Sequence, residues 1–201
     1  IMGFEIIDQS SFSSPTINKS LSETLSVQGK KSITIPLGQM DVKKNIKSLK
    51  VILRTCTSEL IMDQNKKRIF DKGKNEYTFR TLKSLIKSIY AASNQFKNIK
   101  FELIITDSNS PKEDIDKIQK ILNHSNIQNK FVSINPDDFQ DKIKPGYSKA
   151  KFSNMANFYT SLMIAKNEDA DIIYFVEDDY IHSINTITEM IFAYEKFYTI
   201  F

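Results

Sequence analysis

Three consecutive carboxylates, Glu177, Asp178 and Asp179, follow directly after the apolar run "IIYFV". Adjacent negative charges repel one another, and the repulsion is stronger at a dehydrated site than in water. A divalent cation would relieve it, and carboxylate oxygens suit the hard ions Mg²⁺ and Mn²⁺. A metal held in this way can neutralise a diphosphate and stabilise it as a leaving group. The alternative is a solvated turn in which the acids cap a following helix.

Four segments of the chain have the pattern of buried strands that could deliver such residues. They are "LKVILRTC", "KFELIITD", "KFVSIN" and "DIIYFVE". Between them, apolar residues at helical spacing predict helices over 79–96, 110–122 and 151–168, and a last helix covers 183–201. Strands that alternate with helices predict an α/β fold, with a mostly parallel Rossmann-like sheet flanked by helices.

Two of the predicted helices carry specific expectations. Ser110, Pro111 and Glu113 have the spacing of a capping box with proline at the first helical position. In the first helix, the predicted stripe that faces the core is Phe79, Leu82, Ile86, Ile89 and Tyr90. In the third helix, the predicted apolar side is Met155, Phe158, Leu162 and Met163.

Polar residues stand at the carboxyl ends of three of these strands. They are Arg54-Thr55-Cys56, Asp107-Ser108-Asn109 and Glu177-Asp178-Asp179. In open parallel sheets, ligands bind in the crevice outside the carboxyl ends of the strands. We therefore expect the three strand ends to converge on one site. We interpret Cys56 as a packing residue, and His182 either as a ligand contact or as part of a helix start.

Composition limits the other possibilities. The chain has 201 residues, which fits one domain with an extension, and residues 1–47 read as an irregular N-terminal extension with a short strand at 33–35. The net charge of +4, from 28 basic and 24 acidic residues, is spread along the chain, so we do not expect nucleic-acid binding. A single cysteine and no long apolar run fit a cytoplasmic protein without a transmembrane segment. Peripheral membrane contact stays open.

In order and approximate spacing, "VILRTC", "LIITDSNS" and "IIYFVEDDY" resemble the nucleotide-sugar half of family 2-like glycosyltransferases with the GT-A fold. The resemblance covers about residues 48–200 and ends in the short acidic "DXD" motif. It implies a metal-dependent glycosyltransferase that moves a sugar from a nucleotide-diphosphate sugar to a glycan or other hydroxyl acceptor, with inversion. Mn²⁺ or Mg²⁺ would be the cofactor.

The resemblance also assigns roles to residues at the strand ends. Asp107 is similar to the acid that contacts the nucleotide base, and Thr55 would line the same pocket. Arg54 stands where a proline is more usual. Asp179 is similar to the metal ligand, and Glu177 holds the leading position of the motif.

Further assignments concern the donor sugar and its diphosphate. Asp178 would lie near the ribose or the metal. In the family, a helix before the acidic motif crosses the donor, which implies that Lys151, Asn154 and Asn157 contact it. Lys151 would pair with a phosphate. Because Asn154 and Asn157 are three residues apart, we expect them to share a helix face. The alternative is an ordinary amphipathic helix with a solvated polar face.

The sequence departs from the family pattern in several places. "TDSNS" lacks the first acid and the glycine of the common turn, and the connection over 57–78 is long. We expect the domain at 48–201 to be truncated before an acceptor-binding half, so no catalytic base is assigned. Two alternatives are a non-catalytic nucleotide- or metal-binding module and a sugar-phosphate nucleotidyltransferase. The latter normally has a glycine-rich loop, whereas "LRTCTSEL" contains no glycine.

Overall fold

The computed structural model describes residues 32–35, 38–41, 44–58, 73–143 and 146–200. The chain divides into two compact units. One unit is residues 46–187, and the other joins residues 1–45 to residues 188–201. We did not predict that the last residues group with the N-terminal part. Of the long connection expected over 57–78, residues 59–72 lie outside the described residues, as do residues 1–31. Residues 74–78 are the start of a helix instead.

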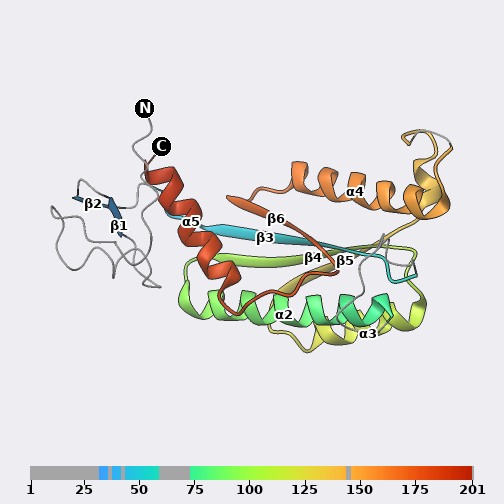
Figure 1. Cartoon of the computed structure of the whole chain (residues 1–201), viewed down its shortest axis with the longest axis horizontal. Coiled ribbons are helices and arrows are strands. Elements are labelled where there is room, and N and C mark those ends of the chain that lie inside the picture. Colours follow the sequence, from blue (N-terminus) through green and yellow to red (C-terminus); the bar gives the residue numbers. More distant parts are fainter. Residues whose placement is uncertain (1–31, 36–37, 42–43, 59–72, 144–145, 201) are drawn as a thin grey trace, which may run out of the picture. The chain divides into compact units, whose positions relative to one another are not determined.

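The larger unit is built on a four-stranded parallel sheet (Figure 1). Its strands are β3 (Ser48–Thr55), β4 (Lys100–Ser108), β5 (Gln128–Ile134) and β6 (Ile172–Glu177). They lie in the order β5-β4-β3-β6, and every neighbouring pair is parallel. The predicted α/β class with a mostly parallel sheet is confirmed.

Strand β3 lies in the middle of the core. Leu49, Val51, Ile52 and Leu53 all have an exposed fraction of 0%. Successive side chains of a strand point to opposite faces, so these four show that both faces of β3 are covered. Burying each such side chain contributes about 1.5–3 kcal/mol, so β3 is a firmly anchored support for the residues at its carboxyl end.

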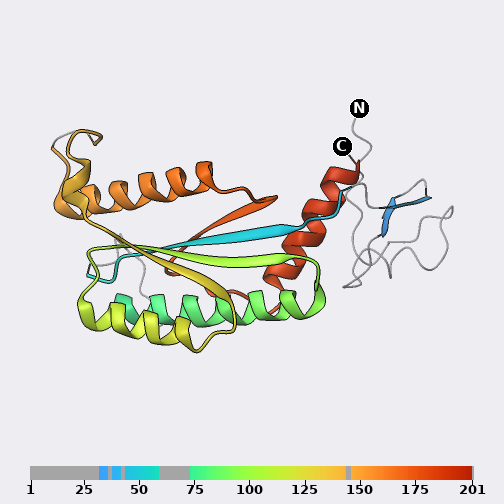
Figure 2. The same cartoon turned by 180° about the vertical axis from the view of Figure 1, so that it is seen from behind.

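Helices cover both faces of the sheet (Figures 1 and 2). α2 (Lys74–Gln95) and α3 (Lys112–Asn123) lie on one face, and α4 (Lys149–Asn167) lies on the other. The apolar residues buried along α2 are Phe79, Leu82, Leu85, Ile89 and Ala92. The predicted stripe was wrong at Tyr90, which is 51% exposed. It lies eight residues after Leu82, and at about 100° per residue this moves it away from the sheet.

The predicted capping box at Ser110 was wrong. α3 begins at Lys112, and Pro111 precedes it without any side-chain cap. The Ser110 hydroxyl donates instead to Asp107 Oδ1 at 2.5 Å and accepts from the backbone N–H of Thr57 at 2.9 Å. The Ser110 oxygen, which would accept a helix N–H in a capping box, accepts from Thr57 instead and does not cap α3.

Helix α4 turns the opposite face to the sheet from the one that its apolar residues would favour. Its buried residues are Ser153, Ala156, Asn157 and Ser161, whereas Met155, Phe158, Leu162 and Met163 are 37–43% exposed. Two hydroxyl pairs join it to β4, Ser108–Ser153 at 2.7 Å and Thr106–Ser161 at 3.0 Å. The four apolar residues lie on one side, as predicted, but that side is exposed, and the alternative of a solvated polar face is wrong for Ser153, Asn157 and Ser161.

The connection before α4 contains a 3₁₀ helix, η2 (Pro136–Phe139). The Asn135 side chain caps it by accepting a hydrogen bond from the backbone N–H of Asp137 at 3.3 Å. This capping needs only neighbouring residues, so η2 is a local feature.

The smaller unit contains an antiparallel hairpin and most of the last helix. The hairpin pairs β1 (Ser32–Ile35) with β2 (Gly38–Asp41), which confirms the short strand predicted at 33–35. Helix α5 spans Thr186–Ile200. Its Tyr194 and Tyr198 rings stack, and the Lys44 ammonium lies 5.0 Å from the Tyr198 ring centroid. Within the described residues, no helix is both long and apolar enough to cross a bilayer.

Candidate functional site at the carboxyl end of the sheet

The ends of β3, β4 and β6 lie side by side. Thr55 is in register with Asp107 on β4, and Arg54 is in register with Glu177 on β6. The strands that follow β3 in the chain first go to one side of it, β4 and then β5, and β6 then pairs on the other side. Such a reversal of strand order opens a crevice at the carboxyl ends, where ligands bind in open α/β sheets.

Asp107 forms the floor of this region. It is 1% exposed and accepts hydrogen bonds from Thr55 Oγ1 at 2.6 Å, Ser110 Oγ at 2.5 Å and the Ser110 N–H at 3.3 Å. Burial raises the pKa of Asp107, and the hydrogen bonds from Ser110 and Thr55 oppose that rise. The carboxylate therefore ties the end of β3 to the turn after β4, and its direct contact with a nucleotide base stays a prediction.

That turn contains a residue in the left-handed region. Asn109 has φ of 69°. Asparagine tolerates this conformation better than most residues, so the turn after β4 can form without a glycine at this position.

A second acid, Asp114 on α3, extends the network beyond the predicted residues. It accepts hydrogen bonds from Thr57 Oγ1 at 2.7 Å and from Asn75 Nδ2 at 3.2 Å. Thr57 follows β3 and Asn75 opens α2, so the network joins three elements at one end of the sheet. Sequence reasoning missed these residues because the contacts connect positions 39 and 57 residues apart.

Asn157 is a structural clamp. Its Nδ2 donates to the carbonyl oxygens of Thr55 at 3.0 Å and Thr106 at 3.1 Å, and the residue is 2% exposed. Asn154 is exposed, and its Oδ1 accepts from Arg54 Nη1 at 3.3 Å. Three residues turn a helix by about 300°, so the two side chains are about 60° apart around the axis, as the predicted shared face requires, with one against the sheet and the other at its rim.

Asp178 is also buried, at 7% exposure. It accepts hydrogen bonds from the Cys56 N–H at 3.3 Å and Thr78 Oγ1 at 2.9 Å, and Lys74 Nζ lies 3.6 Å from its other oxygen. Burial raises the pKa of Asp178, while Lys74 opposes the rise. Lys74 and Thr78 belong to the first turns of α2 and were not predicted, since nothing local connects them to an acid about 100 residues away.

The two remaining acids of the motif face outward. The Glu177 side chain is 57% exposed and forms an ion pair with Arg54, with Oε1 2.5 Å from Nη2. Asp179 is exposed. Arg54 also donates from Nη1 to Asn154 Oδ1 at 3.3 Å, and its guanidinium carbon lies 5.1 Å from the Phe158 ring centroid.

The exposed acids determine which ligands are available to a metal ion at this site. In the described part of the chain, no group of three or more His, Cys, Asp or Glu side chains could hold a metal ion. Glu177 and Asp179 offer two exposed carboxylates, whereas the Asp178 oxygens already have partners. Two protein carboxylates fit Mg²⁺ or Mn²⁺ when phosphate and water oxygens complete the coordination.

Lys151 and His182 make contacts of their own. The Lys151 ammonium lies 4.2 Å from the Tyr147 ring centroid and is exposed. His182 is 8% exposed, its Nε2 is 3.2 Å from the Tyr174 hydroxyl, and its backbone N–H donates to Ser84. Burial lowers the pKa of His182. These contacts pack the start of the segment that follows β6.

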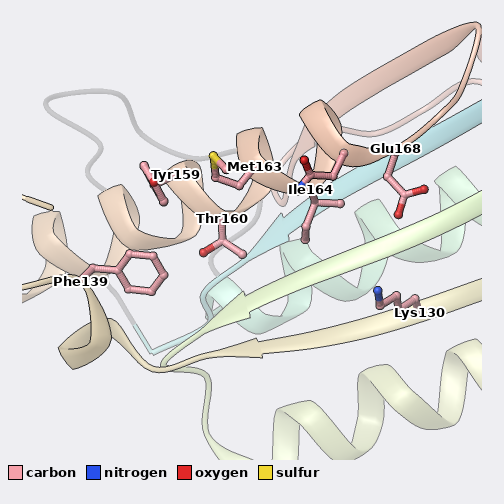
Figure 3. Close-up of a pocket in the computed structure, with 8 residues that line it drawn as sticks. Lys130, Phe139, Tyr159, Thr160, Met163, Ile164 and Glu168 are labelled. Atoms are coloured by element: carbon pink, nitrogen blue, oxygen red, sulfur yellow. The ribbon is translucent and has the colours of Figure 1, made fainter.

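Two cavities lie on the α4 side of the sheet. One of about 580 Å³ is beside the turns after β4 and β5, lined by residues that include Asn109, Gln140, Tyr147 and Lys149. The other, of about 390 Å³, runs between α4 and β5, with Tyr159, Met163 and Ile164 above and Lys130 below (Figure 3). Of the three predicted strand ends, Asn109 lines the first cavity, and none of the residues assigned to donor or metal binding lines either one.

Comparison with known proteins finds a distant similarity to a solved structure. No family model matches the sequence, and no curated protein matches it. The structure aligns with the crystal structure of S. aureus TarS 1–349 at a TM-score of 0.39 and 17% sequence identity. The alignment covers 71% of this chain and 31% of that chain, so this chain spans about a third of that structure's length.

Proposed function

We propose that the carboxyl end of β3, β4 and β6 binds a nucleotide-diphosphate sugar and that the protein is a GT-A-like glycosyltransferase. The observation that carries the proposal is the reversal of strand order between β3 and β6, beside the exposed Glu177 and Asp179. A switch point of this kind is where open α/β sheets place their ligands. The acceptor would be a glycan or another hydroxyl compound.

Each part of the ligand has a candidate partner. Thr55 and Asp107 form the floor on which the base would lie, and Asn157 holds that floor by binding two strand carbonyls. Arg54 and Lys151 would face the diphosphate, with Asn154 beside Arg54. Asp178 fixes the start of α2 through Thr78 and Lys74, next to the ribose that it would approach.

A divalent cation, Mn²⁺ or Mg²⁺, would be held by Asp179 and Glu177. When bound, it would supply positive charge that stabilises the leaving diphosphate. The fold keeps the carboxylates of Glu177 and Asp179 exposed beside the hydrogen-bonded network that holds Asp178. Burial and three partners hold Asp178 in that network, and exposure leaves Asp179 accessible.

Calorimetry tests this proposal directly. UDP, GDP and CDP are each titrated into the chain with and without Mn²⁺, and the series is repeated on Asp179→Ala. We expect one nucleotide to bind only with the metal and to lose binding in the variant. Asp116→Ala, which removes an exposed aspartate of α3, is the matched control and should bind like the wild type. If no nucleotide binds under either condition, the proposal is wrong.

Measuring turnover of a nucleotide sugar distinguishes a glycosyltransferase from a non-catalytic binding module. Once the nucleotide is known, the matching nucleotide sugar is incubated with the chain, and free nucleotide is measured over time. Slow release that needs both Mn²⁺ and Asp179 supports a transferase, because water can replace an absent acceptor. Metal-dependent binding without release supports the non-catalytic module, and pyrophosphate release from a nucleoside triphosphate and a sugar phosphate supports the nucleotidyltransferase.

A further inference from the structure

The ion pair between Arg54 and Glu177 stands at the place where the proposed ligand would bring both a phosphate and a metal. The two residues are register partners on adjacent strands, β3 and β6. Arg54 Nη2 and Glu177 Oε1 are 2.5 Å apart. Glu177 therefore neutralises the guanidinium that a phosphate would contact, and Arg54 neutralises the carboxylate that a metal ion would contact.

The two partners are held very differently. The Arg54 side chain is only 15% exposed and has two further contacts, with Asn154 and with the ring of Phe158. Glu177 is 57% exposed, and among the described residues its carboxylate pairs with Arg54 alone. Arg54 is thus fixed in position by its surroundings, whereas Glu177 can rotate away by breaking this one ion pair.

We propose that Arg54 and Glu177 form an exchange pair: a ligand phosphate takes Arg54 while a divalent cation takes Glu177 and Asp179. This inference rests on the proposed function and deepens it, because it states how the site couples its two ligands. Ion pairs with a well-exposed partner contribute little stability, so each ligand can compete with this one. An arginine fork also suits phosphate oxygens as well as it suits a carboxylate.

The exchange makes the two ligands cooperative. A phosphate that takes Arg54 leaves Glu177 available to a cation, and a cation that takes Glu177 leaves Arg54 available to a phosphate. Coupling between two binding sites is reciprocal, so each ligand must tighten the other by the same factor. For the wild type we expect a factor of about ten, within the usual range of such couplings.

Variants of the two partners should shift the two affinities in opposite directions. Calorimetry is done with the probes Mn²⁺ alone and inorganic pyrophosphate alone, on the whole chain. Glu177→Gln removes the competing charge, so pyrophosphate without metal should bind about tenfold tighter than to the wild type. Arg54→Gln should bind Mn²⁺ alone more tightly and pyrophosphate more weakly. A purely structural ion pair would give neither gain.

Lys50 and Glu102 are also register partners on adjacent strands, and their ion pair at 3.1 Å provides matched controls. Lys50 precedes Arg54 by four residues along β3, away from the carboxyl end of the sheet. Lys50→Gln and Glu102→Gln should therefore leave both affinities unchanged. If Arg54→Gln does not fold, Arg54→Lys replaces it, and that variant should weaken pyrophosphate binding because an ammonium offers a single point of contact.

The outcomes separate this inference from the proposed function. Opposite shifts in the two variants support the exchange pair. If the wild type binds a nucleotide with Mn²⁺ but Glu177→Gln shows no gain for pyrophosphate, the exchange pair is overturned and the proposed function stands. If the wild type binds no nucleotide under any condition, the proposed function falls, and the inference falls with it.

Discussion

The acids at the carboxyl end of the sheet form two groups with opposite surroundings. Asp107 and Asp178 are buried and saturated with hydrogen bonds from three elements of the fold. Glu177 and Asp179 are exposed, although Asp178 lies between them in the chain. Glu177 is the last residue of β6, and the turn that follows it buries Asp178 while leaving Asp179 exposed. One acidic motif therefore supplies both framework and exposed carboxylates.

The largest expected effect tests the buried group. Asp107→Ala should lower the free energy of unfolding by about 3 kcal/mol, since it leaves the buried hydroxyls of Thr55 and Ser110 without their acceptor. Urea denaturation measures this loss. Asp107→Asn should recover part of it, because an amide oxygen can still accept one of these hydrogen bonds. A loss below about 1 kcal/mol would show that Asp107 is not a framework residue.

A pair of identical residues sharpens the same contrast on α4. Asn157→Ala should cost about 2 kcal/mol of unfolding free energy, because the carbonyls of Thr55 and Thr106 lose a buried donor. Asn154→Ala, three residues earlier and exposed, should cost less than about 0.5 kcal/mol. Thermal and urea unfolding of both variants check the difference. Equal losses would contradict the assignment of Asn157 as the clamp.

Acidity provides a third test, smaller in size. Burial raises the pKa of Asp178 in the folded state above its ordinary value of 3.8. Between the pKa of the unfolded state and the raised pKa of the folded state, only the folded state keeps this proton. The free energy of unfolding must therefore fall as pH rises through this window. Asp178→Asn has no proton to lose, so its stability relative to the wild type should increase over the same window and then level off.

Urea unfolding of the wild type and Asp178→Asn at a series of pH values measures this. Parallel curves for the two proteins across the acid range would contradict the raised pKa. The test does not depend on a ligand, so it probes the framework alone.

The smallest expected effect on stability belongs to the exposed group. Glu177→Ala and Asp179→Ala should change the unfolding free energy by no more than about 0.5 kcal/mol, because neither side chain is buried. The same substitutions should abolish metal-dependent nucleotide binding, measured by calorimetry. A large loss of stability in Asp179→Ala would remove the distinction between the two groups of acids.

The main strands and helices of the larger unit, and their order, could be predicted from the sequence. Apolar β-branched runs predicted β3, β4, β5 and β6, and alternation with helices predicted a parallel sheet. The convergence of three polar strand ends also followed, because parallel strands end at the same edge. These features depend on short-range patterns and on general rules of chain connection, both of which can be read along one chain.

The sequence did not show which of these side chains are buried and hydrogen-bonded and which are exposed, because that depends on the tertiary structure. Lys74 and Thr78 meet Asp178, and Arg54 meets Glu177, across separations of about 100 residues or more. Helix α4 presents small polar residues to the sheet because hydroxyl pairs with β4 and the Asn157 clamp outweigh its apolar pattern. Such choices depend on contacts between distant segments, which form only when the sheet has assembled.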